Sequence, residues 1–177
     1  ERMAKGFIRL HDAIDLETVR GEEGAAARVY FENFRRMVTR DQRQLASTKR
    51  TKRPPRDEMN AVLSFLYALV RAECAAALEG VGLDPQVGYL HTLRPGRPSL
   101  ALDLMEELRP LVADRLALTL VNRHQLTSAD FESLPGGAVH LTDSGRRTVV
   151  TAYQRRKEDQ VQHRVLREKV PLGLVPH

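Results

Sequence analysis

Two carboxylates and a histidine could do chemistry in residues 91–110, which read HTLRPGRPSLALDLMEELRP. Asp103 and Glu106 are three positions apart, so that on a helix both side chains lie on one face. The surrounding residues 100–108 are apolar almost all the way round, which is the composition of a buried helix. Ionised carboxylates there cost free energy unless a positive group lies opposite them, and that group is either an arginine or a metal ion.

The types of donor indicate which metal ion would suit such a site. His91 ends an apolar segment twelve positions before Asp103 (103 − 91). One imidazole with carboxylates and no thiolate suits Mn²⁺ or Mg²⁺ before zinc, and such an ion polarises a phosphodiester bond. A lone histidine is also commonly a hydrogen-bonded core residue, so the spacing alone leaves both interpretations open. The sequence contains no Ser-His-Asp arrangement, Walker loop or dinucleotide fingerprint that would indicate another chemistry.

Three stretches of the sequence are together similar to the motifs of one known protein family. They are GEEGAAARVYF at residues 21–31, NAVLSFLYALVRAECAAALEGVGLDP at residues 60–85 with GYLH following, and HTLRPGRPSLALDLMEELRPLVADRL at residues 91–116. In this order and with this spacing they resemble the CRISPR-associated integrase, the catalytic subunit of the spacer-acquisition complex. The resemblance runs over most of the chain.

The resemblance implies a divalent-metal-dependent DNA endonuclease and integrase that acts in CRISPR adaptation and antiviral defence. In this family the 3′-hydroxyl of a prespacer duplex attacks a phosphodiester at the CRISPR repeat, and the same site can cut branched DNA. Carried over, Glu23, His91 and Glu106 are the expected metal ligands, with Mn²⁺ or Mg²⁺ as the ion. Asp103 is the fourth expected catalytic residue, and it orients a ligand, binds metal or positions DNA.

The resemblance also implies partners and a division of the chain. The expected partners are double-stranded and branched DNA, a second copy of the chain in a homodimer, the small second Cas protein of the adaptation complex, and a fused or associated Cas end-processing nuclease. We expect residues 1–21 to lead in from a missing β-rich N-terminal domain. Residues 22–160 are then the helical catalytic domain, and residues 161–177 an extended tail.

Composition places the chain among globular proteins, with 42% hydrophobic and 29% charged residues over 177 positions. Its one cysteine, Cys74, excludes an intramolecular disulfide and a Cys-rich zinc site, and fits a cytoplasmic protein. The most apolar run, residues 61–78, carries Arg71 and Glu73 and is better interpreted as a core helix than as a membrane span. We expect Glu73 to pair with a basic neighbour.

The predicted fold is mainly α, a multi-helix catalytic domain around a central buried helix, with at most a short strand near the C-terminus. Helices are predicted at residues 22–43, at 58–79 with Asp57 as N-cap, and from Ser99, the expected N-cap, to Pro110. Pro110 must kink or break that helix, and a further helix follows at residues 111–122. A strand at residues 138–141 and a last helix from Thr142 to about residue 159 complete the pattern.

The net charge of +5 favours an anionic partner, nucleic acid first. The residues expected to contact DNA phosphates are Arg28, Arg35, Lys49, Arg50, Lys52, Arg53, Arg56 and Arg97, five of them in the loop ASTKRTKRPPRD. Arg109, Asp114, Arg115 and Arg123 are candidates either for bracing ion pairs or for DNA contact. Two alternatives to an enzyme stay open: a non-catalytic helical DNA-binding module, and a helical scaffold that recruits acidic proteins.

Overall fold

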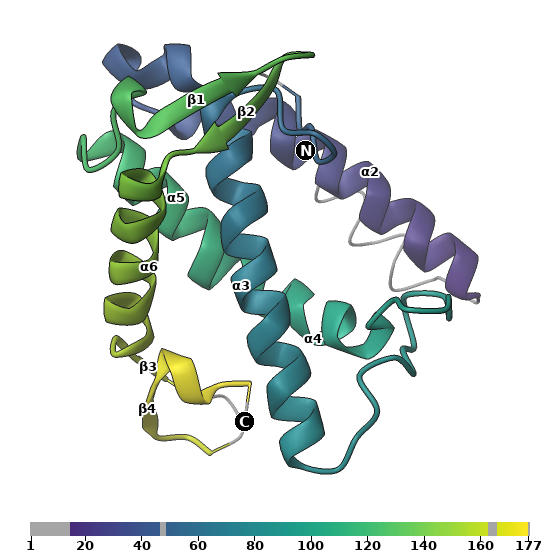
Figure 1. Ribbon diagram of the computed structural model, residues 1–177. Coiled ribbons are helices and arrows are strands. Elements are labelled where there is room, and N and C mark those ends of the chain that lie inside the picture. The colour runs from purple at the N-terminus through teal and green to yellow at the C-terminus, as the bar shows by residue number, and fades with distance from the viewer. Residues whose placement is uncertain (1–14, 47–48, 163–165, 177) are drawn as a thin grey trace.

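Helix α3 (Glu58–Gly80) runs through the middle of the molecule, with α4, α5 and α6 packed against it (Figure 1). The structure, a computed structural model, describes residues 15–46, 49–162 and 166–176. The other helices are α2 (Leu16–Phe34), α4 (Ser99–Arg109), α5 (Arg115–Asn122) and α6 (Asp143–Lys157). The prediction of a mainly α fold around a central buried helix is confirmed.

Helix α3 begins where the sequence predicts, because Asp57 acts as its N-cap and accepts a hydrogen bond from the backbone N–H of Asn60 (2.9 Å). Its buried apolar side chains include Leu63, Leu66 and Cys74. By length and apolar composition α3 could also cross a membrane. However, 44% of that stretch is buried inside the domain, which is the environment of a core helix.

A proline changes the helical register between α4 and α5. Pro110 has no N–H to donate, and the chain makes a π-helical turn, η3 (Pro110–Asp114), before α5 begins. The predicted break at Pro110 is therefore present as a register change within one nearly continuous rod. Ser99, predicted to be the N-cap, is instead the first helical residue, and its hydroxyl donates to the carbonyl of Thr92 (2.9 Å).

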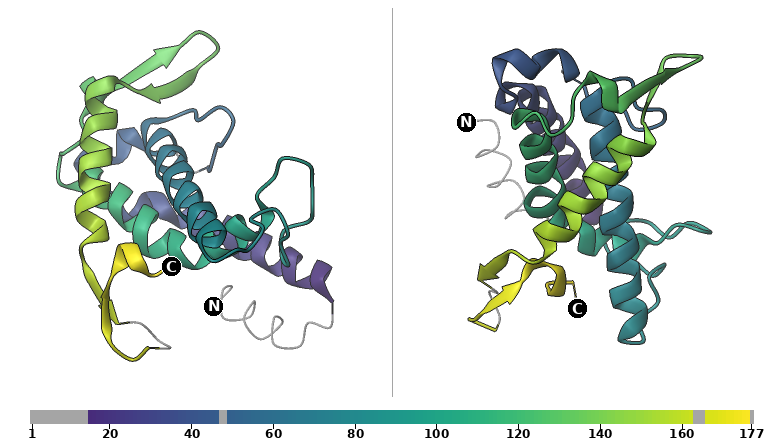
Figure 2. Two further views of the ribbon diagram at one scale, coloured as in Figure 1. Left: turned by 60° about the horizontal axis from the view of Figure 1, so that its bottom comes forward. Right: turned by 60° about the vertical axis from the view of Figure 1, so that its left-hand side comes forward.

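Helix α2 differs from its predicted range of 22–43. It starts earlier, at an N-cap made by Asp15, and it ends at Phe34, after which the short 3₁₀ helices η1 (Arg35–Met37) and η2 (Arg40–Leu45) follow. The helix does not continue because the side chain of Asn122 on α5 binds the backbone that follows. It accepts a hydrogen bond from the N–H of Thr39 and donates one to the carbonyl of Met37 (3.0 Å each). Figures 1 and 2 show α2 on the opposite side of α3 from α6.

The C-terminal part adds two small antiparallel hairpins. Strand β2 (Ala138–Leu141) is the predicted strand, and it pairs with β1 (Phe131–Leu134), which follows the short 3₁₀ helix η4 (Ser128–Asp130). Helix α6 follows with Thr142 as its N-cap, as predicted. Within residues 161–177, expected to be extended, β4 (Lys169–Pro171) pairs with β3 (Gln160–Gln162), and the 3₁₀ turn η5 (Leu172–Leu174) buries Leu172 in the core.

Candidate functional site

Three elements far apart in the sequence supply the walls of one cavity of about 770 Å³. Glu23 comes from α2, His91 from the loop between α3 and α4, and Glu106 from α4. The structure therefore brings the three expected metal ligands to one place. As they stand, no three His, Cys, Asp or Glu side chains within residues 15–46, 49–162 and 166–176 form a group close enough to hold a metal ion. Binding would require these side chains to draw together.

Asp103 holds the histidine loop against α4. Its Oδ2 accepts the backbone N–H groups of Tyr89 (2.6 Å) and Leu90 (2.9 Å). Its Oδ1 accepts the N–H of His91 (2.9 Å) and lies 2.6 Å from the Nδ1 of the His91 ring. Burial opposes ionisation of Asp103, but these four contacts outweigh it and lower the pKa of the carboxyl. The ionised carboxylate favours the tautomer with a proton on Nδ1, which leaves Nε2 with its lone pair for a ligand.

Two further contacts dock this loop. A side chain at Gly88 would meet Ser99, since a Cβ built there lies 2.6 Å from the Ser99 Cβ, so that only glycine permits the close approach. On the other side, the Nε of Arg20 on α2 donates to the carbonyl of Leu90 (2.5 Å). The loop is thus held between α4 and α2, the two helices that carry the acidic residues of the cavity.

Glu106 is a partly buried acid with a neighbouring acid. Burial raises the pKa of Glu106, the charge of Arg109 acts against this, and the negative charge of Glu23 raises it further. The guanidinium of Arg109 lies 2.8 Å from the Glu106 carboxylate. Two repelling carboxylates beside an imidazole nitrogen are a donor set that fits Mn²⁺ or Mg²⁺, because a divalent cation relieves the repulsion that ionisation creates.

Asp114 joins the helices behind this cavity. The π-helical turn places its carboxylate in the core, 1% exposed, where it accepts hydrogen bonds from the hydroxyls of Tyr30 (2.8 Å) and Tyr67 (2.5 Å). Tyr30 follows Glu23 by seven residues (30 − 23), about two helical turns, and therefore lies on the same face of α2. The Asp114 contact thus fixes the face of α2 that carries Glu23.

Sequence reasoning left Asp114 undecided between bracing and DNA contact, and missed both tyrosines as its partners. The ring of Tyr67 lies close to two guanidinium groups, with its centroid 5.3 Å from the Cζ atom of Arg50 and 5.5 Å from that of Arg109. Nothing local in the sequence signals this cluster, since its members come from α2, α3, α4, η3 and the loop at residues 49–57. Glu73, in contrast, pairs with a basic residue as predicted, at 2.5 Å from Lys157.

The basic residues expected to contact DNA divide into two groups. Arg50 is committed to the protein, because it donates to the side chains of Asn60 (2.8 Å) and Ser64 (3.0 Å). Arg56 likewise donates to the carbonyl of Gly136, and Arg35 donates to the carbonyl of Arg43 (3.4 Å).

The other five expected contacts, like Arg50 itself, line the two cavities. Arg28, Lys49 and Lys52 line the cavity already described. A second cavity of about 730 Å³ shares His91 and Glu106 with the first, and its basic lining residues are Arg50, Lys52, Arg53, Arg71, Arg94, Arg97 and Arg109. The candidate site is therefore a pair of adjoining cavities with basic walls, with His91 and Glu106 where they meet and Glu23 in the first cavity.

Comparison with known proteins identifies the family. Residues 1–155 match the family model described as CRISPR associated protein Cas1. The chain is 57% identical over 175 residues to CRISPR-associated endonuclease Cas1 1 of Moorella thermoacetica, a match that covers 99% of this chain and 51% of that protein. It is 42% identical over 158 residues to a Cas4 exonuclease/Cas1 endonuclease fusion of Geobacter sulfurreducens, with 88% and 28% covered.

Solved structures agree. A casposase bound to integration product superposes with a TM-score of 0.86 at 27% identity, covering 98% of this chain and 48% of that one. A Cas6-RT-Cas1–Cas2 complex superposes with a TM-score of 0.84 at 26% identity, with 98% and 18% covered. The chain spans about half the length of the curated Cas1 endonuclease it matches at 57% identity. Since the family model covers most of the chain and the fold agrees, the chain belongs to the Cas1 family of CRISPR-associated proteins.

Proposed function

We propose that this chain carries the active site of a metal-dependent DNA endonuclease and integrase, which joins the 3′-hydroxyl of a prespacer to a phosphodiester of a CRISPR array. One observation carries the proposal: Glu23, His91 and Glu106 reach the wall of one basic-lined cavity from three separate elements. The names of the relatives agree with it, since they include endonucleases and a casposase bound to an integration product.

In this proposal Glu23, Glu106 and the Nε2 of His91 hold a Mn²⁺ or Mg²⁺ ion. When bound, such an ion polarises the phosphodiester and stabilises the charge that develops on it. Asp103 serves as a positioning residue, because all four of its contacts orient His91 or the backbone leading to it. Arg109 neutralises Glu106 in the absence of a cation. With a cation in place, the guanidinium becomes available to a DNA phosphate.

The proposed partners follow from the same site. Double-stranded and branched DNA would lie along the two cavities, with Lys52, Arg53 and Arg97 contacting phosphates. The Cas6-RT-Cas1–Cas2 complex and the Cas4/Cas1 fusion support a small Cas2-like partner and an associated end-processing nuclease. We also propose a homodimer, and the cytoplasm as the compartment.

Strand joining with matched variants tests the proposal. The complete protein, its small partner and a duplex with 3′-hydroxyl ends are incubated with and without Mn²⁺, and joined product is counted. Glu106→Ala should lower joining more than about 100-fold, because even residues that only support a metal ligand cost about 10–100-fold. Glu107→Ala is the control, since Glu107 is exposed on the same helix and lines neither cavity.

Folding and DNA binding must survive the Glu106 change. The substitution removes repulsion with Glu23 and also a partly exposed ion pair with Arg109, which is worth only about 0.2–1 kcal/mol. The free energy of unfolding without metal should therefore change little, and duplex binding should persist. Joining that needs no divalent metal, or that withstands Glu106→Ala, would instead identify a DNA-binding module with structural acids.

A further inference from the structure

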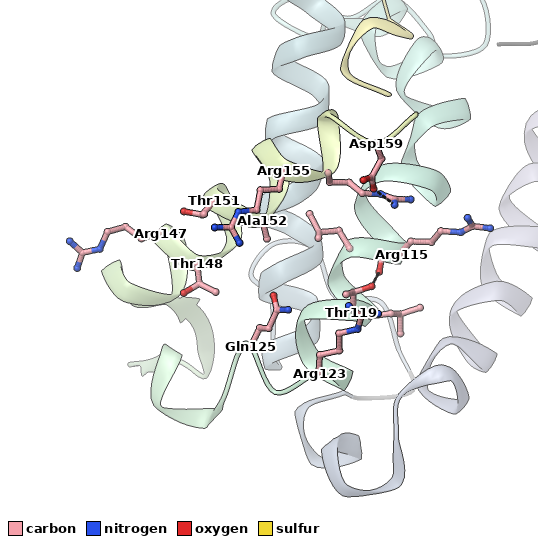
Figure 3. A pocket seen from close by; sticks show the side chains of 13 residues that line it. Arg115, Thr119, Arg123, Gln125, Arg147, Thr148, Thr151, Ala152, Arg155 and Asp159 are labelled. Atoms are coloured by element: carbon pink, nitrogen blue, oxygen red, sulfur yellow. Dashed lines mark hydrogen bonds and ion pairs between the residues drawn. The ribbon is translucent and has the colours of Figure 1, made fainter. Parts of the chain in front are cut away.

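A second basic cleft lies between α5 and α6, on the other side of α3 from the candidate site. Its volume is about 850 Å³, and Figure 3 shows residues of α6 on one side and of the α5 segment on the other. The charged residues that line it are Arg115, Arg123, Arg147, Arg155, Arg156 and Asp159. It shares no lining residue with the cavities that hold His91 and Glu106.

Only one of the five arginines is committed to another group. Arg156 pairs with Asp159 (2.6 Å) and donates to the carbonyl of Leu111 (3.0 Å), which braces α6 against η3 and neutralises the one acid of the cleft. The guanidinium groups of the other four are exposed and make no hydrogen bond or ion pair with any residue that the structure describes. Four unpaired positive charges around one hollow repel one another and favour an anionic ligand.

The arrangement of donors fits a phosphodiester backbone. Arg147, Thr151 and Arg155 follow each other at intervals of four residues along α6, and all three line the cleft. This row is about 12 Å long (eight residues at about 1.5 Å each), and along 12 Å of its axis a duplex carries roughly three to four phosphates on each strand. Thr148 and Gln125 add hydroxyl and amide groups, which commonly accompany arginine in phosphate contacts.

The apolar part of the cleft argues against a protein partner. Leu116, which lines the cleft, is only 6% exposed, and no aromatic side chain lines the cleft. Protein interfaces usually have a central apolar or aromatic anchor that fills a pocket. A nucleic acid needs no such anchor, because its binding depends on neutralised phosphates.

We propose that the α5–α6 cleft binds the phosphodiester backbone of a DNA duplex, away from the strand held at the metal site. The proposal rests on the function proposed above in one respect: an integrase must hold two DNA molecules together, the one that carries the 3′-hydroxyl and the one that receives it. DNA bound in the cleft would leave the cavities around Glu106 free for the other DNA molecule.

Salt dependence of binding tests the cleft without chemistry. The complete protein is titrated with a fluorescein-labelled duplex in EDTA at a series of salt concentrations, and log K is plotted against log salt. Arg147→Gln should lower the slope by about 0.9, and Arg147→Gln with Arg155→Gln by about 1.8, since each lost phosphate contact releases fewer counterions. Arg146→Gln is the matched control, because this neighbouring arginine pairs with Asp143 (3.3 Å) and does not line the cleft.

A crosslink places the DNA. Thr151→Cys introduces an exposed thiol into the cleft, whereas the native Cys74 is fully buried, with its pKa raised by burial to about 11. A benzophenone maleimide on residue 151 should crosslink the labelled duplex on illumination. An unchanged slope in the double variant would overturn the proposal, and so would a crosslink that captures only the small protein partner.

The two proposals fail separately. Glu106→Ala should abolish joining and leave both the salt slope and the crosslink intact. If joining withstands Glu106→Ala, the integrase assignment falls while the cleft result stands. If joining depends on Glu106 but the double arginine variant binds DNA with the slope of the wild type, the cleft assignment falls alone.

Discussion

Replacing Asp103 with asparagine tests whether this carboxylate positions His91. Its two oxygens accept four contacts, from the N–H groups of Tyr89, Leu90 and His91 and from the Nδ1 of the His91 ring. An amide has only one oxygen. Two of the four donors must therefore face an NH₂ group, whichever way the new side chain turns, and the charge that favours the Nδ1–H tautomer is lost.

The structure sets the size of the effect. A hydrogen bond to a charged group contributes roughly 1.5–3 kcal/mol, and the loss of two would cost about 3–6 kcal/mol if both were fully buried. The side chain of Asp103 is 14% exposed, so water can satisfy part of the deficit, and we expect a destabilisation of about 3 kcal/mol, the lower limit. Metal affinity should fall about 10–100-fold, as for other partners that orient a metal-binding histidine.

Manganese titrations distinguish a positioning residue from a ligand. Free Mn²⁺ is followed by electron paramagnetic resonance, and strand joining is measured over a range of Mn²⁺ concentrations. Because Asp103→Asn retains all three proposed ligands, joining should recover as Mn²⁺ is raised, whereas His91→Ala should stay inactive. Glu107→Gln, an exposed change on the same helix, should bind Mn²⁺ as the wild type does.

Either of two results would refute this reasoning. Wild-type affinity for Mn²⁺ in Asp103→Asn would show that the four contacts do not hold the histidine for metal binding. Joining that stays absent at every Mn²⁺ concentration, in a variant that remains folded by circular dichroism, would show that Asp103 itself contacts the ion or the DNA.

Three further predictions concern the support of the site and its DNA contacts. Tyr30→Phe and Tyr67→Phe each remove one hydrogen bond to Asp114, and each should destabilise the protein by about 1–2 kcal/mol in thermal unfolding. Tyr30→Phe should weaken Mn²⁺ binding more than Tyr67→Phe, because Tyr30 lies on the helix that carries Glu23. Equal weakening of Mn²⁺ binding would contradict this prediction. Burial raises the pKa of Asp114 despite its tyrosine partners, so the folded state holds this proton more tightly than the unfolded state. The difference in free energy of unfolding between the wild type and Asp114→Asn, measured by urea melts, should therefore fall as pH rises from about 4 through that raised pKa, because the contributions of Asp103 and Glu106 are common to both proteins. Arg50→Gln should destabilise the protein by about 1–3 kcal/mol, since Arg50 is tied to α3, whereas Arg53→Gln should leave unfolding unchanged and lower the salt slope of DNA binding by about 0.9.

Local signals were sufficient where neighbours in the sequence decide the conformation. Asp57 and Thr142 were recognised as N-caps, because a cap satisfies N–H groups only two or three residues away. The break at Pro110 was likewise visible, since it needs only the missing N–H. The end of α2 could not be predicted from its neighbours in the sequence, because it depends on Asn122, which lies more than eighty positions later in the chain.

The same distinction holds for the candidate site. The resemblance named Glu23, His91 and Glu106, but it left Asp103 with three possible roles and placed Arg50 among the DNA contacts. The side chain of Asp103 is engaged with the histidine loop, and that of Arg50 with α3 and with the Tyr67 ring. No periodicity in the sequence shows which of these partners will be near.

By itself, therefore, the sequence determined the family, the helical class of the fold and the starts of α3 and α6, because family motifs and these caps are properties of short stretches. Only the tertiary structure decided which charged groups are engaged and which are free. A carboxylate or guanidinium can bind water, metal, phosphate or another side chain, and its choice depends on the donors that packing brings within about 3 Å. Asp103 lies within α4 and Asp114 at the end of the π-helical turn that follows it, and packing pairs the first with a histidine and the second with two tyrosines.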